Sequence, residues 1–109
     1  MKDKRFQLAQ IVRQEMERSL ALEELACLAE TTKELVREYC EIGLLGEEMR
    51  EVGPEIRFGE GSIFLVRRIE QLRIEYGVSS SAAGLVLDLA ARVEELENEI
   101  RSLREAMGR

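Results

Sequence analysis

Apolar positions in the last third of the chain recur at alternating spacings of four and three residues. The run starts at Ala82 and continues through Val86, Leu89, Val93, Leu96, Ile100, Leu103 and Met107. Such a stripe keeps the period of about 3.5 residues of a coiled coil, with β-branched residues at one seam position and Leu at the other, as two-stranded coils favour. We therefore predict that residues 79–109 form a dimerisation helix.

The stripe also leaves an alternative open, in which the helix folds back on its own domain. The narrow seam beyond Val93 argues against this, because a chain of 109 residues has little else to cover it. The apolar surface is wider at the proximal end of the helix, because Leu85 and Leu87 are also apolar there. We expect this end to pack against the domain while the distal end dimerises.

Shorter apolar periodicities predict one helix in residues 22–29 and another in residues 31–42. The second helix begins with a capping-box signature, because Thr31 stands three residues before Glu34 and the two side chains can cap each other's backbone N–H groups. Gly43 is predicted to end this helix.

Glycine and proline cluster in residues 46–61, which hold four of the eight glycines and the only proline. This segment is typical of a loop or hairpin. We expect Ser62 to cap a third helix that Gly77 ends, and the serines at 79–81 to open the last one.

The segment from residue 6 to residue 12 fits two patterns. Phe6, Leu8, Gln10 and Val12 alternate as in a half-buried strand, whereas Leu8, Ile11, Val12 and Met16 would form the apolar stripe of a helix. We predict a strand.

Composition agrees with a single, mostly helical domain, since 45% of residues are apolar, 35% are charged and only 5% are aromatic. No apolar run approaches the roughly 18 residues of a membrane span, so we expect no membrane association. Cys27 and Cys40 lie in apolar-periodic segments and are expected to be free thiols of a cytoplasmic protein.

The chain contains no histidine, which removes the usual general base for a Ser or Cys nucleophile and the commonest nitrogen ligand for zinc or iron. Two cysteines thirteen positions apart do not supply the ligands of a metal site. We therefore expect a binding protein, not an enzyme, with no cofactor.

The order of these elements resembles the MerR-type winged helix-turn-helix. The resemblance lies in Leu35-Val36-Arg37-Glu38-Tyr39 and Ile42-Gly43-Leu44-Leu45, similar to that family's recognition helix and its exit into the wing, and in Arg57-Phe58, where the wing closes. The stretches Leu22-Glu23-Glu24-Leu25-Ala26 and Ala83-Gly84-Leu85-Val86-Leu87-Asp88-Leu89 are similar to the CbpM branch, the chaperone-modulatory proteins. Glu30-Thr31 stands where the family usually has Gly-Val.

The resemblance implies a mostly α fold, with a winged helix-turn-helix domain in residues 1–78 that has an N-terminal extension and a short β-hairpin wing, followed by a coiled-coil helix in residues 79–109. It also implies a dimeric cytosolic partner of a DnaJ-like co-chaperone of the CbpA type, which binds the J-domain and inhibits co-chaperone activity and DNA binding. Charges beside the seam favour a parallel dimer, whereas MerR-like dimers typically pair antiparallel, so the orientation stays open.

Charge supports a protein partner independently. Residues 19–58 carry ten acidic and four basic side chains, whereas DNA-binding surfaces need Lys or Arg against phosphates. Glu34, Glu38 and Glu41 recur at helical spacing, and we predict that they bind the partner. The predicted surface also includes Glu23, Glu24 and Glu30. An ordinary solvated helix face is the alternative for these carboxylates.

A transcription factor of the MerR type remains the alternative function. Its duplex contacts would come from Arg37, Lys33 and Arg57, helped by the basic N-terminal residues Lys2, Lys4 and Arg5. Arg37 is more simply explained as an intrahelical partner of Glu41. Tyr39 and Phe58 are expected in the core. A coiled-coil scaffold with an inert domain is a third possibility.

Overall fold

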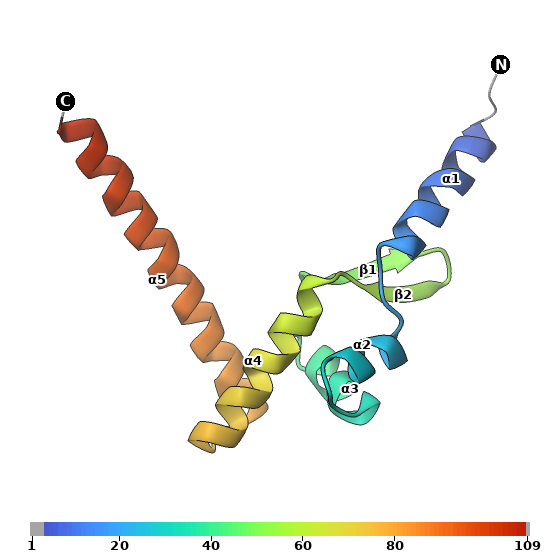
Figure 1. The fold of residues 1–109 in the computed structure, drawn as a ribbon, viewed down its shortest axis with the longest axis horizontal. Coiled ribbons are helices and arrows are strands. Elements are labelled where there is room, and N and C mark those ends of the chain that lie inside the picture. Colours follow the sequence, from blue (N-terminus) through green and yellow to red (C-terminus); the bar gives the residue numbers. More distant parts are fainter. Residues whose placement is uncertain (1–3, 109) are drawn as a thin grey trace.

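The computed structural model describes residues 4–108, so Lys2 lies outside the described residues. In this range five helices and one small sheet follow one another (Figure 1). The elements are α1 (Lys4–Glu17), α2 (Leu22–Leu28), α3 (Lys33–Glu41), β1 (Met49–Val52), β2 (Glu55–Phe58), α4 (Gly61–Tyr76) and α5 (Ser80–Met107). The predicted mostly helical fold with a long C-terminal helix is confirmed.

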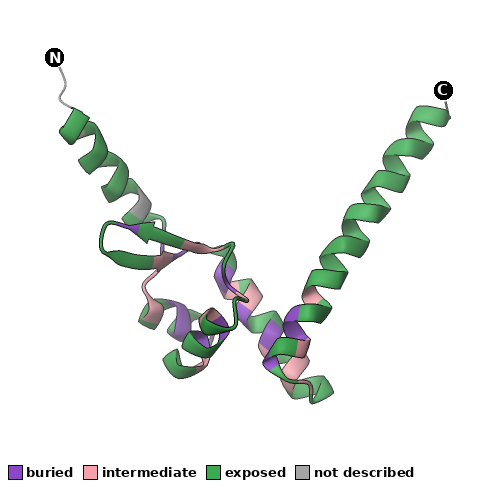
Figure 2. Ribbon diagram, turned by 180° about the vertical axis from the view of Figure 1, so that it is seen from behind, coloured by how far each residue is buried: buried purple, intermediate pink, exposed green. Residues whose placement is uncertain are grey.

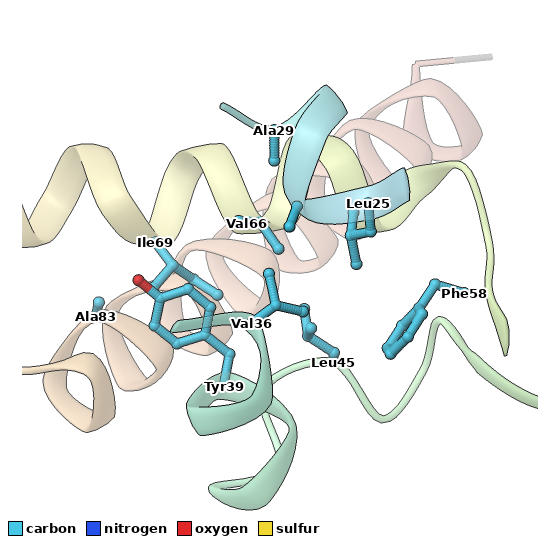
Figure 3. Close-up of a cluster of buried hydrophobic side chains, with 10 residues drawn as sticks. Leu25, Ala29, Val36, Tyr39, Leu45, Phe58, Val66, Ile69 and Ala83 are labelled. Carbon is cyan, nitrogen blue, oxygen red and sulfur yellow. The ribbon is translucent and has the colours of Figure 1, made fainter. Parts of the chain in front are cut away.

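The core lies where α2, α3, β2 and α4 meet, while α1 and α5 run outward as two arms (Figure 1). Figure 3 shows the buried side chains, which are Leu25, Ala26, Ala29, Val36, Tyr39, Leu45, Phe58, Val66, Ile69 and Ala83. The apolar faces of α2, α3 and α4 thus meet in one cluster with Phe58 of β2 and Ala83 of α5, because a small domain needs a single shared core. Tyr39 and Phe58 belong to it, as predicted.

The hairpin predicted in residues 46–61 is confirmed. Strands β1 and β2 pair antiparallel, with Met49 opposite Phe58, and Gly53 takes a φ of +63° in the connecting turn. The segment before α2 joins this sheet, because the backbone N–H of Leu20 donates to the carbonyl of Phe58 at 2.7 Å and that of Phe58 donates back at 2.9 Å. The hairpin is therefore anchored beside α2.

The strand predicted for residues 6–12 is wrong, because the chain is helical from Lys4 to Glu17. No strand in the described part of the chain pairs with this segment, and a helix satisfies its own backbone hydrogen bonds. The exposed residues Leu8, Ile11, Val12 and Met16 form the helical stripe.

Two predicted caps are also wrong. The N-cap of α3 is Thr32, whose hydroxyl accepts from the N–H of Leu35 at 3.2 Å, while Thr31 is turned to α4. Helix α4 begins at Gly61, and the Ser62 hydroxyl donates back to the carbonyl of Gly59. Thr31 does not cap α3 because its hydroxyl donates to Glu70, and Ser62 does not cap α4 because its hydroxyl donates to the backbone.

The junction between α4 and α5 follows the prediction. Gly77 ends α4 with a left-handed φ of +65°, and the hydroxyl of Ser79 caps α5 by accepting from the N–H of Ala82 at 3.1 Å. Gly43 likewise takes a φ of +84° just after α3. Glycine is the residue that adopts these angles without steric cost.

The proximal end of α5 packs on the domain, as expected, through Leu87 and two small residues but not through Leu85. Ala83 and Gly84 are buried, and a Cβ on Gly84 would collide with the side chain of Leu44. Leu87 packs against the core, whereas Leu85 is exposed. Beyond this first contact α5 is exposed over most of its length (Figure 2).

Candidate functional site

Helix α3 carries its carboxylates on the side away from the core. Val36 and Tyr39 are buried, whereas Glu34, Glu38 and Glu41 are exposed. Their spacing of four and three residues places the three glutamates in one row along the helix surface. The structure thus brings together these three predicted site residues, and we call them the acidic stripe.

The other predicted carboxylates are exposed as well, but two of them already contact neighbouring residues. Glu24 accepts a hydrogen bond from the N–H of Ala21 at 3.0 Å, and Glu30 lies 3.9 Å from Arg67. Glu23 is exposed in the first turn of α2, where negative charge favours the helix N-terminus. These three residues therefore have structural roles beside the predicted one.

The cations of the alternative DNA surface fall into two groups. Lys33 and Arg37 are exposed on α3, and no ion pair among the described residues joins Arg37 to Glu41, so the expected pair does not form. The Arg57 side chain is only 14% exposed. An intramolecular set of contacts holds it in place.

Arg57 links the hairpin to the end of α1. Its Nε donates to the hydroxyl of Ser19 at 3.0 Å, and its Nη2 donates to the carbonyls of Ser19 at 3.0 Å and Met16 at 3.2 Å. Glu24 and Glu55 lie 3.9 Å and 3.6 Å from the guanidinium. Charge-assisted bonds of this kind are strong, so Arg57 fixes where α1 leaves the domain.

Sequence reasoning missed a hydrogen-bonded network behind α3. Glu70 of α4 accepts from the hydroxyls of Thr31 at 2.6 Å and Tyr39 at 3.1 Å, and Arg73 donates to the Tyr39 oxygen at 2.8 Å. Burial raises the pKa of the Tyr39 phenol, the Arg73 bond lowers it, and the charge of Glu70 raises it. The network locks α3, and with it the acidic stripe, onto α4.

The predicted seam of α5 is open to solvent in this single chain. Its seven residues are between 41% and 84% exposed, and they are Val86, Leu89, Val93, Leu96, Ile100, Leu103 and Met107. The helix packs on its own domain through Ala83, Gly84 and Leu87, which lie roughly opposite the seam at about 100° per residue. The protomer thus leaves the seam available to another helix.

The remaining chemistry of the site is limited. Within residues 4–108 no group of three acidic or thiol side chains is placed to hold a metal ion. Cys27 is exposed, and burial raises the pKa of the half-buried Cys40 thiol.

None of the helices in residues 4–108 combines the length and the apolar character that crossing a bilayer requires. Comparison with family models, curated proteins and solved structures finds no match.

Proposed function

We propose that this chain is a chaperone modulator of the CbpM type, built on a MerR-like winged helix-turn-helix. In this proposal α2 and α3 are the helix-turn-helix, the β1–β2 hairpin is the wing and α5 is the dimerisation helix. The chain is not an enzyme, and it acts in the cytoplasm on the J-domain of a DnaJ-like co-chaperone of the CbpA type.

The observation that carries the proposal is the acidic stripe on the exposed side of α3. In a helix-turn-helix that reads DNA, this side enters the major groove between the phosphate backbones, and negative charge there opposes binding. The same charge attracts a basic helix, and J-domains present one to Hsp70. Rigid support from the Tyr39–Glu70 network suits a surface that has to present three charges together.

The mechanism that follows is competition. When the acidic stripe covers the basic helix of the J-domain, Hsp70 loses access to the same surface, and co-chaperone activity falls. Dimerisation through the seam places two stripes in one assembly, which would raise the apparent affinity for a partner that presents two J-domains, through effective concentration. Masking of basic residues would also lower the co-chaperone's binding to DNA.

A binding experiment tests this function. A variant carrying Glu34→Lys, Glu38→Lys and Glu41→Lys should bind a purified CbpA-type J-domain at least about tenfold more weakly in calorimetry, since three charge pairs are reversed. The matched control carries Glu51→Lys, Glu75→Lys and Glu105→Lys, which are also exposed and change the net charge equally. The control should bind within about twofold of the wild type.

The DNA-binding alternative makes the opposite prediction. Submicromolar binding of the wild-type chain to duplex DNA, with a steep dependence on salt, would show that the negative surface does not govern the function. Equal loss of J-domain binding in both triple variants would show that net charge, not the acidic stripe, is recognised. Absence of wild-type binding to any such J-domain would also contradict the proposal.

A further inference from the structure

A groove runs between α4, α5 and the turn that follows α3. Its floor is formed by Leu65, Leu87 and Ala91, which line both halves of it. One half encloses about 240 Å³ beside Leu44 and Gly84. The other half passes Phe64, an aromatic side chain that is 72% exposed. An exposed aromatic beside an apolar floor is typical of a surface that binds another protein segment.

The rim of the groove is acidic. Glu47 and Asp88 line the first half, and Glu48 and Glu94 lie along the second. Arg68 is the one cation among these lining residues. An apolar floor with a negative rim fits an amphipathic helix that carries positive charge.

The groove is distinct from the α5 seam. At about 100° per residue, Leu87 and Ala91 lie roughly 100° to 160° around the helix from Val86, Leu89 and Val93. A coiled coil formed through the seam would therefore leave the groove open. Its occupant has to come from elsewhere than α5.

Helix α1 has the complementary chemistry. Leu8, Ile11, Val12 and Met16 lie in one exposed stripe, each between 37% and 61% exposed. The helix carries three basic and two acidic side chains, and its first eleven residues, 4–14, hold all three basic ones and neither acidic one. The stripe spans about 12 Å from Leu8 to Met16, close to the roughly 10 Å that separate Leu87 from Glu94 along α5.

We infer that α1 of one copy of this chain docks in the α4–α5 groove of a second copy. Arg57 fixes the end of α1 through the carbonyls of Met16 and Ser19, and α1 and α5 run away from the domain as separate arms (Figure 1). The helix is thus presented outward, toward another molecule. This inference goes beyond the proposed function, because it needs only a second copy and no J-domain.

Photo-cross-linking between copies tests the inference. A full-length chain with photoreactive benzoylphenylalanine in place of Leu8 is mixed with isotopically heavy wild-type chain and irradiated. Mass spectrometry should find the label joined to a heavy peptide that contains Leu87 and Ala91. Benzoylphenylalanine in place of Gln10, on the opposite face of α1, is the matched control and should give at most a trace of this product.

The charges of the rim provide a second measurement. Asp88→Lys together with Glu94→Lys should lower the yield of the cross-link about fivefold, because two attractive contacts become repulsive. Circular dichroism checks whether this variant is folded. A cross-link within the same copy, a cross-link to α1 of the heavy chain, or no cross-link would each overturn the inference, and none of these results depends on J-domain binding.

Discussion

The phenol of Tyr39 donates a hydrogen bond of 3.1 Å to the carboxylate of Glu70, across the interface between α3 and α4. Tyr39 is fully buried, and its oxygen also accepts from Arg73, whose guanidinium carbon lies 5.9 Å from the ring centroid. One side chain thus fills the core with its ring and orients two charged residues with its oxygen. The position of α3 depends on this arrangement.

Tyr39→Phe removes the oxygen and retains the ring. We expect the free energy of unfolding to fall by about 1–2 kcal/mol, because Glu70 and Arg73 each lose a hydrogen bond. Urea titration followed by circular dichroism measures the change. Tyr76→Phe is the control, since Tyr76 is exposed and should change stability by less than about 0.5 kcal/mol. Equal stability of both variants would show that the hydrogen bonds of the Tyr39 hydroxyl contribute nothing to stability.

The pH dependence of stability follows from the pKa of Tyr39, which burial raises above its ordinary value of 10.0. Well below pH 10.0 the phenol is protonated in both the folded and the unfolded chain, so its contribution to the free energy of unfolding is complete there. Above that pH the unfolded chain ionises first, and stability is lost as the pH passes through the folded pKa.

Tyr76→Phe leaves Tyr39 as the one tyrosine of the chain. Its tyrosinate absorbance should then titrate above pH 10.0 in the folded protein. The loss of stability above this pH should be smaller in the double variant that also carries Tyr39→Phe. A titration at or below the ordinary pKa would contradict the burial argument.

Glu30 has a φ of +60°, which favours glycine. Glu30→Gly should therefore raise stability by about 1 kcal/mol over Glu30→Ala, because both variants lose the exposed contact with Arg67 and only Gly relieves the backbone strain. Thermal unfolding of the two variants measures the difference. Equal melting temperatures would exclude backbone strain at this turn.

Arg57→Met should lower the free energy of unfolding by about 2–3 kcal/mol, since it removes charge-assisted hydrogen bonds to Ser19 and Met16. Amide hydrogen exchange should also accelerate at residues 14–20, where Arg57 holds the chain. Arg37→Met is the matched control on an exposed position. If the two substitutions have the same effect on stability and exchange, Arg57 does not hold the end of α1 in place.

Leu96→Glu should convert the proposed dimer to a monomer. Two leucines leave the seam in each dimer, and glutamate keeps the helix propensity, so the dissociation constant should rise more than about 100-fold. Sedimentation equilibrium measures this constant. Ser102→Glu, on the side of α5 away from the seam, should leave it within about threefold. A dissociation constant that changes no more in the Leu96 variant than in the Ser102 variant would show that the seam is not an interface.

Local patterns sufficed where the physical cause is local. The Gly77 stop, the Ser79 cap and the glycine-rich hairpin depend on backbone conformation and on neighbours within four residues, and these are visible in sequence. The apolar stripe of α5 and the acidic stripe of α3 follow from helical spacing alone. Their exposure agrees with the predicted faces, while their partners remain a proposal.

Tertiary structure decided what depends on contacts between distant residues. Residues 6–12 are helical because no strand in residues 4–108 pairs with them. Thr31 leaves the cap to Thr32 because Glu70, thirty-nine positions away, accepts a hydrogen bond from its hydroxyl. Leu85 stays exposed because α5 docks through Ala83 and Gly84. Apart from α1, the sequence by itself determined the helices of residues 4–108, the turns and the distribution of charge, since each arises from neighbouring residues. Only the packed chain determined which hydroxyl caps α3, which arginine holds the end of α1 and which face of α5 is buried. These choices depend on contacts between distant residues, which no local pattern contains.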